Sequence, residues 1–68
     1  MSKLTDTQWV ELIRIAVDMM HSGLRMGQSY MIALNEIDAN LYEQVTATNN
    51  DCFYNDNKII NFLTFLEP

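Results

Sequence analysis

Apolar residues recur every three or four positions over much of this chain of 68 residues, which is the repeat of one face of an α helix. The first such stretch lies in residues 5–21. The residues of its main apolar stripe are Trp9, Leu12, Ile13, Ala16, Met19 and Met20. Val10 and Val17 form a second stripe beside it, so the apolar face is wide enough to contact two neighbouring elements. The charged residues of the polar side are Glu11, Arg14 and Asp18.

The ends of this first helix carry their own signals. Thr5 and Gln8 have the spacing of a capping box, in which the cap hydroxyl and the side chain three residues later each accept a backbone N–H. We predict that the helix begins at Thr5 or Thr7 and ends near His21, where a cation is favoured by the helix dipole. The turn residues Ser22-Gly23 follow.

A second helix is predicted from about Leu24 to Ile37, with apolar groups nearly all round it. Gly27 lies inside it, where glycine costs about 1 kcal/mol relative to alanine. The simplest compensation is the close approach of another helix, so we expect a neighbouring helix to contact Gly27. Gly23, by contrast, is typical of a turn.

A third, short helix is predicted over residues 38–45, with Asp38 as its cap and Leu41 and Val45 pointing inward. Residues 46–51 then break the pattern, because β-branched and Asn/Asp side chains favour turns.

The last helix is predicted to begin at Asn55 or Asp56 and to end before Glu67-Pro68. It is apolar on most of its circumference, so we expect it to be buried on several sides or to pack against a second molecule.

These patterns together predict an all-α fold, a compact bundle of three to four short helices that forms a single helical domain over residues 1–68. A domain of this size buries only about 60% of its unfolded surface, and its single cysteine excludes an internal disulfide. Because 49% of the residues are apolar, we expect the bundle to gain stability by pairing with a second copy as a dimer.

The charge pattern argues against nucleic-acid binding. The net charge is −5, and the four bases, Lys3, Arg14, Arg25 and Lys58, are scattered rather than gathered into a patch. No secretory signal pattern and no apolar run of about 20 residues is visible. An unpaired cysteine fits a reducing compartment. We therefore expect a cytoplasmic protein with no membrane partner.

The candidate chemical groups favour structural roles. Cys52 follows Asp51 and precedes Phe53, neighbours that disfavour a thiolate, so we expect a half-buried loop cysteine rather than a nucleophile. One cysteine and one histidine cannot build a conventional zinc site. The paired carboxylates, Glu36 with Asp38 and Asp51 with Asp56, fall at helix ends and turns, and no glycine-rich phosphate loop occurs. The sequence therefore predicts no enzyme, no catalytic residue, no cofactor and no metal site.

The aromatic pair Phe53-Tyr54 stands in an otherwise polar loop. One interpretation is that Phe53 plugs the base of the helical core while the Tyr54 hydroxyl finds a backbone partner. The rival interpretation is that one ring projects outward and anchors a partner, a role in which tyrosine is enriched.

Four segments of the chain resemble, in order, a family of small proteins encoded by tailed bacteriophages, with relatives in bacteria. Residues 24–34 (LRMGQSYMIAL) resemble its R-x-G-Q-x-x-x-N-A-L segment, and residues 41–48 resemble its L-x-x-x-I-x-G-T helix end. Residues 51–56 (DCFYND) resemble D-P-F-Y-x-D, and residues 59–66 resemble the closing I-x-x-F-x-x-x-L. The resemblance implies a phage source, for example T4-like cyanophages, and a helical fold, but no mechanism.

The chain departs from this pattern at three positions. Ile32 stands where Asn is usual, Ala47 where Gly is usual, and Cys52 where Pro is usual. Because proline could not act as a thiol nucleophile, the last departure favours a structural turn at Cys52.

The main functional hypothesis is a non-enzymatic phage protein that binds a host or phage protein in the host cytoplasm. The candidate partner-binding residues are Arg25, Gln28, Tyr54 and Asp56. The residues expected to shape the loop are Asp51 and Phe53.

Two other readings stay open. The alternative function is a nucleic-acid-associated regulator with a helix-turn-helix-like arrangement around Ser22-Gly23, against which the charge argues. A third reading is an enzyme whose site forms across subunits, lined by Arg25, Gln28 and Asp51.

Overall fold

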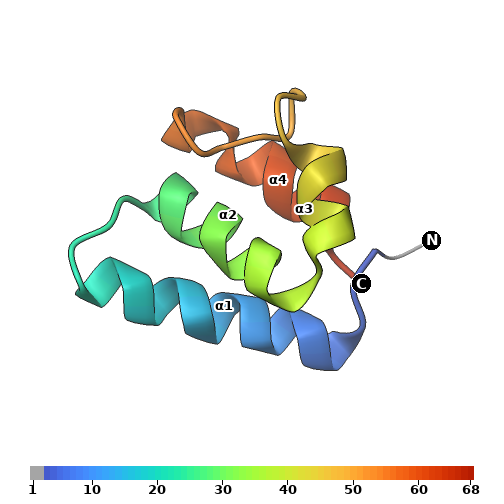
Figure 1. Cartoon of the computed structure of the whole chain (residues 1–68), viewed down its shortest axis with the longest axis horizontal. Coiled ribbons are helices and arrows are strands. Elements are labelled where there is room, and N and C mark those ends of the chain that lie inside the picture. The colour runs from blue at the N-terminus through green and yellow to red at the C-terminus, as the bar shows by residue number, and fades with distance from the viewer. Residues whose placement is uncertain (1–2) are drawn as a thin grey trace.

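The computed structural model of the chain describes residues 3–68. Within this range four α helices form: α1 (Asp6–His21), α2 (Met26–Ile37), α3 (Ala39–Val45) and α4 (Ile59–Leu66), with the 3-10 helix η1 (Asp56–Lys58) leading directly into α4. Figure 1 shows α2 lying between α1 on one side and α3 with α4 on the other. No strand occurs in the described part of the chain, so the predicted all-α bundle of short helices is confirmed.

The capping box predicted at the first helix is present. The Thr5 hydroxyl accepts the Gln8 backbone N–H at 3.1 Å, and the Gln8 side chain accepts the Thr5 N–H at 3.0 Å. The helix ends at His21, as predicted, and Gly23 has a φ of +104°, a conformation that glycine adopts without a Cβ clash. Local sequence chemistry therefore fixes both ends of α1.

The second helix begins two residues later than the sequence predicted. Arg25 is extended, with φ −68° and ψ 156°, and acts as the N-cap residue without a side-chain cap bond. Helical periodicity cannot locate this boundary, because Leu24 and Arg25 fit the pattern and yet belong to the connection. The first turn of α2 is therefore left to find its hydrogen-bond acceptors elsewhere in the fold.

Helices α2 and α3 are separated by Asp38 alone. Its backbone is extended, and its carboxylate accepts the Leu41 N–H at 3.1 Å, as the sequence predicted for the cap of this helix. The chain therefore turns sharply between α2 and α3 with no loop between them.

The core lies mainly around α2, whose Tyr30, Met31, Ala33 and Leu34 are buried. The other buried apolar residues are Leu4, Leu12, Ala16, Leu41, Val45, Cys52, Phe62 and Leu66. The Tyr30 and Phe62 rings meet edge to face, with centroids 6.0 Å apart, and join α2 to α4. All the helices therefore share one core, in which α2 is the central element.

The flanking stripe of α1, formed by Val10 and Val17, is not buried within the chain. Val10 is 62% exposed and Val17 is also exposed, so the prediction that this face contacts a second element is wrong for the single chain. In the described part of the chain α1 packs chiefly against α2 (Figure 1), and this contact buries Leu12 and Ala16 of the main stripe. On the last helix Phe62 and Leu66 are buried but Ile60 is 72% exposed.

Gly27 is approached by a loop rather than by the helix that we expected. A Cβ placed there would lie 2.0 Å from the Cys52 carbonyl oxygen and 2.7 Å from Asp56 Oδ1. Cys52 lies in the loop between α3 and η1, and Asp56 is the first residue of η1. The absence of a side chain at Gly27 therefore allows this segment to dock on the first turn of α2.

We predict that Gly27→Ala lowers the free energy of unfolding by about 1–3 kcal/mol, because the methyl group must push the Cys52 carbonyl away. Urea denaturation followed by circular dichroism measures this change. Asn35→Ala, at an exposed position of the same helix, is the control. It should raise stability slightly through helix propensity. A Gly27→Ala variant as stable as the parent would contradict the close approach.

Candidate functional site

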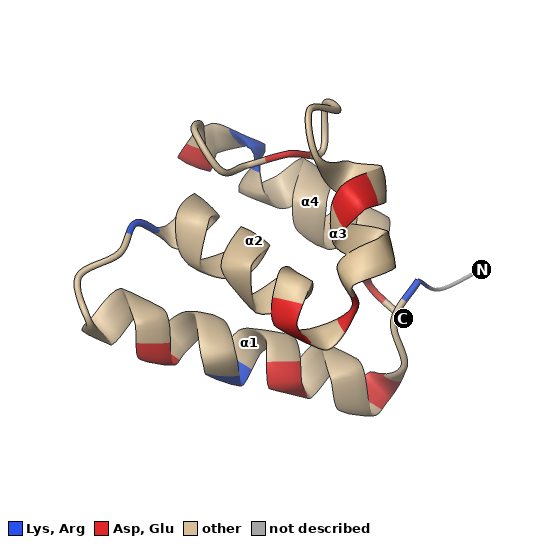
Figure 2. Ribbon diagram, viewed as in Figure 1, with Lys and Arg blue, Asp and Glu red and all other residues tan. Residues whose placement is uncertain are grey.

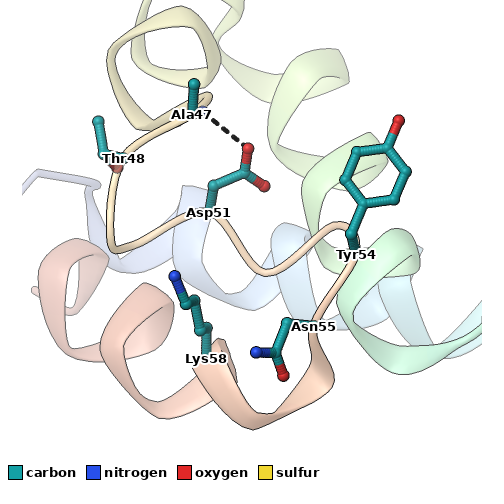
Figure 3. Close-up of a pocket in the computed structure, with 6 residues that line it drawn as sticks. All are labelled: Ala47, Thr48, Asp51, Tyr54, Asn55 and Lys58. Carbon is teal, nitrogen blue, oxygen red and sulfur yellow. Dashed lines mark hydrogen bonds between the residues drawn. The ribbon is translucent and has the colours of Figure 1, made fainter.

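The loop between α3 and η1 is braced from within by one carboxylate. Asp51 Oδ2 accepts the Ala47 N–H at 2.8 Å (Figure 3), and Asp51 Oδ1 accepts the Phe53 N–H at 2.9 Å. Both oxygens thus receive backbone donors from opposite halves of the loop. The Thr48 hydroxyl donates to the Val45 carbonyl at 2.6 Å and ties the start of the loop to the end of α3.

The same loop is fastened to the first turn of α2 by three longer-range contacts. The Arg25 guanidinium donates to the Phe53 carbonyl at 2.7 Å, and Asp56 Oδ1 accepts the Gly27 N–H at 3.0 Å. The Cys52 thiol donates to the Gly27 carbonyl at 3.4 Å. Asp56 therefore supplies, from 29 residues away, the acidic cap that the sequence next to α2 lacks.

Cys52 is the deepest residue of the loop. The sequence predicted a half-buried cysteine, but the side chain is fully buried, because docking on Gly27 carries it into the core. Burial raises the pKa of the Cys52 thiol to about 12, with smaller contributions from the charges of Asp51 and Asp56. A thiol held protonated in this way is not a nucleophile at neutral pH.

The two aromatic rings of the loop separate into an inner and an outer one. Phe53 is half-buried against the core, whereas Tyr54 is 84% exposed. The rings contact edge to face, with centroids 4.7 Å apart. The prediction that the Tyr54 hydroxyl finds a backbone partner is wrong, because Phe53 takes the inner position and turns the next side chain outward. Tyr54 is the most exposed large apolar side chain in residues 3–68.

Two open hollows flank the Tyr54 ring. The first has a volume of about 280 Å³, and its lining residues are Ala47, Thr48, Asp51, Tyr54, Asn55 and Lys58 (Figure 3). The second has a volume of about 140 Å³, and its lining residues are Met31, Tyr42, Thr46, Asp51, Phe53 and Tyr54. Tyr54 and Asp51 line both hollows; the other residues of the first are mainly polar, and those of the second include Met31, Tyr42 and Phe53.

The four candidate partner-binding residues differ in exposure and in their contacts. Arg25 and Asp56 form hydrogen bonds within the chain, to the Phe53 carbonyl and the Gly27 N–H, and Gln28 is half-buried on α2 next to Gly27. Arg25 is also exposed, but Tyr54 alone of the four is both exposed and without a hydrogen-bond partner in the described chain. The structure therefore brings Arg25 and Asp56 together with Asp51 and Phe53 as the frame that holds Tyr54.

Sequence reasoning did not select the other residues that line the hollows. In the sequence Lys58 stands out only as one of four scattered bases, and Met31 and Tyr42 lie within predicted helices. The sequence holds a partial signal for Lys58, because a base follows the aromatic pair by one helical turn. No local signal places Met31 or Tyr42 beside this loop.

The described residues show none of the arrangements that a metal centre or a membrane span would need. Residues 3–68 hold no group of three or more His, Cys, Asp or Glu side chains able to bind a metal ion. Within the same range no helix has the length and apolar character required to cross a membrane. Comparisons of the chain with family models, curated proteins and solved structures gave no match.

We predict that Ala47→Gly stabilises the fold by about 0.5–1 kcal/mol. Ala47 has a φ of +65°, a left-handed conformation that costs a residue with a Cβ about 1–2 kcal/mol, and part of the gain is offset by the greater freedom of glycine in the unfolded chain. Thermal unfolding measures the change. Ala39→Gly, in the first turn of α3, is the matched control and should destabilise. Equal effects of both substitutions would refute strain at Ala47.

We predict that the Cys52 thiol resists alkylation by iodoacetamide at about pH 8 while the chain is folded and reacts once urea unfolds it. Its pKa is raised in the fold from an ordinary 9.0. The stability that this burial contributes is therefore complete below about pH 9 and is lost as the pH rises toward 12. Mass spectrometry of the alkylated chain follows the reaction. Labelling of the folded chain at the rate of the unfolded one would contradict the burial.

Proposed function

We propose that the chain is a non-enzymatic interaction protein and that Tyr54 is its principal contact with a protein partner. The observation that carries the proposal is the exposure of a large aromatic ring, 84% accessible, on a loop that is fixed at both ends. Aromatic side chains of this kind bury large areas when a partner covers them and dominate many interfaces.

The bracing of the loop supports this role on energetic grounds. Ordering a mobile loop on binding costs free energy, and a loop already held in its bound shape avoids that cost. Here Asp51, Arg25 and Asp56 together hold the backbone on both sides of Tyr54. The side chain itself has only two torsions to fix, so Tyr54 can contribute contact area at a small entropic cost.

The proposal includes a phage source and a host or phage protein as partner, in the cytoplasm of the host. The resemblance described above supports the source. One detail adds support, since Ala47 takes the position at which the phage pattern has Gly, and its positive φ is the conformation that favours Gly. The dimer expected from the composition stays a prediction.

We predict that Tyr54→Ala abolishes partner binding while leaving the fold intact, because the ring makes little contact with the core. The tagged chain is used to capture proteins from a lysate of infected host cells, and mass spectrometry identifies what is held. Circular dichroism and thermal unfolding verify the fold of the variant.

The matched control is Ile60→Ala, which removes a different exposed apolar side chain, 72% accessible, on α4. The proposal requires that a protein held by the parent chain is also held by Ile60→Ala and is lost with Tyr54→Ala. A partner retained by Tyr54→Ala, or a collapse of the fold in that variant, would show that Tyr54 is not the contact.

A further inference from the structure

We propose that the Tyr54 surface recognises an acidic peptide segment of its partner, with a carboxylate of that segment seated in the polar hollow beside Lys58. The inference rests on the proposed function and adds the chemistry of the partner. It starts from how the positive charges of the chain are used.

Three of the four bases have partners within the described chain. Arg14 forms ion pairs with Glu11 at 2.8 Å and Asp18 at 3.5 Å on α1. The Arg25 guanidinium is held by the Phe53 carbonyl, and the Lys3 amine lies 5.0 Å from the centre of the Phe65 ring. Figure 2 shows that basic positions are few and far apart on this acidic molecule.

Lys58 differs from the other three bases. Among residues 3–68 its amine has no hydrogen bond, ion pair or aromatic contact, and it lines the hollow next to Tyr54. In Figure 3 the Lys58 side chain extends along this hollow. Asp51 lines the same hollow, but its carboxylate accepts the backbone N–H groups of Ala47 and Phe53 and forms no ion pair with Lys58 in the described chain. The Lys58 charge is therefore available to an anion from outside.

Asn55 supplies a second donor at the same place. Its side-chain oxygen accepts the Asn57 N–H at 3.0 Å, which fixes the orientation of the amide. The NH₂ group is thereby turned away from η1, and Figure 3 shows it on the side of Lys58. The hollow therefore offers a carboxylate two kinds of donor, the Lys58 ammonium and the Asn55 amide.

The charge balance of the molecule selects a carboxylate over a more highly charged anion. One available cation on a chain of net charge −5 suits a single negative charge, whereas a nucleic acid or an anionic membrane would meet overall repulsion. The second hollow, which Tyr54 lines together with Met31, Tyr42 and Phe53, offers a place for an apolar side chain. The fitting segment thus carries an acidic and an apolar residue, one for each hollow beside Tyr54.

A random dodecapeptide library displayed on yeast, selected against the immobilised full chain, tests the inference. The selected peptides should contain Asp or Glu together with an apolar residue. The best of them is then synthesised, and fluorescence anisotropy measures its affinity for the parent chain and its variants. We expect Lys58→Glu to weaken binding about tenfold or more, as befits the loss of a charge-assisted hydrogen bond.

The matched control is Lys3→Glu, which changes the net charge equally but lies outside the hollow, and it should leave the affinity within about twofold of the parent. Replacing the acidic residue of the peptide by Lys should restore binding to Lys58→Glu. Circular dichroism confirms that each variant is folded.

The outcomes separate this inference from the function on which it rests. Peptides that need Tyr54 but show no acidic preference, or that bind Lys58→Glu as well as the parent, overturn the acidic segment and leave Tyr54 as the contact. A selection that yields no peptide dependent on Tyr54 overturns the acidic segment as well. The capture experiment with Tyr54→Ala then decides the proposed function independently.

Discussion

The close contact between Gly27 and the Cys52 carbonyl is the constraint on which the rest of the structure depends. It is possible only without a side chain at position 27, and it brings Asp56 to the Gly27 N–H and the Cys52 thiol to the Gly27 carbonyl. An unfilled helix N-terminus and a loop with no secondary structure thus satisfy each other's backbone groups. Arg25, just before the helix, closes the same junction by donating to the Phe53 carbonyl.

This junction also decides which aromatic ring faces the solvent. Cys52 enters the core because its carbonyl sits over Gly27, Phe53 packs partly beneath the loop, and the next residue, Tyr54, has no room inside. The exposure of Tyr54 is therefore a consequence of packing two residues earlier rather than a local preference of tyrosine. Exposing the aromatic ring to water costs free energy, and a partner that covers the ring would remove this cost.

Much of the helical framework could be predicted because its signals are local. The Thr5–Gln8 capping box and the Asp38 cap each lie within three residues of the backbone groups that they satisfy. The candidate site could be predicted only in part, because its defining contacts join residues 25 to 29 positions apart. The glycine inside the second helix predicts that another segment approaches Gly27, but helical periodicity carries no information on which distant segment does so.

The difference between local and distant signals also explains why two charged candidates for partner binding have a structural role in the fold. Arg25 and Asp56 are among the partner-binding residues expected from the sequence, but the fold uses both to close its own junction. A charged side chain already engaged by the backbone would lose that bond on turning to a partner, leaving a helix end uncapped. On the proposed function, partner binding is then left to groups that the fold does not need. Around this loop those are the Tyr54 ring and the Lys58 amine, which line one hollow together.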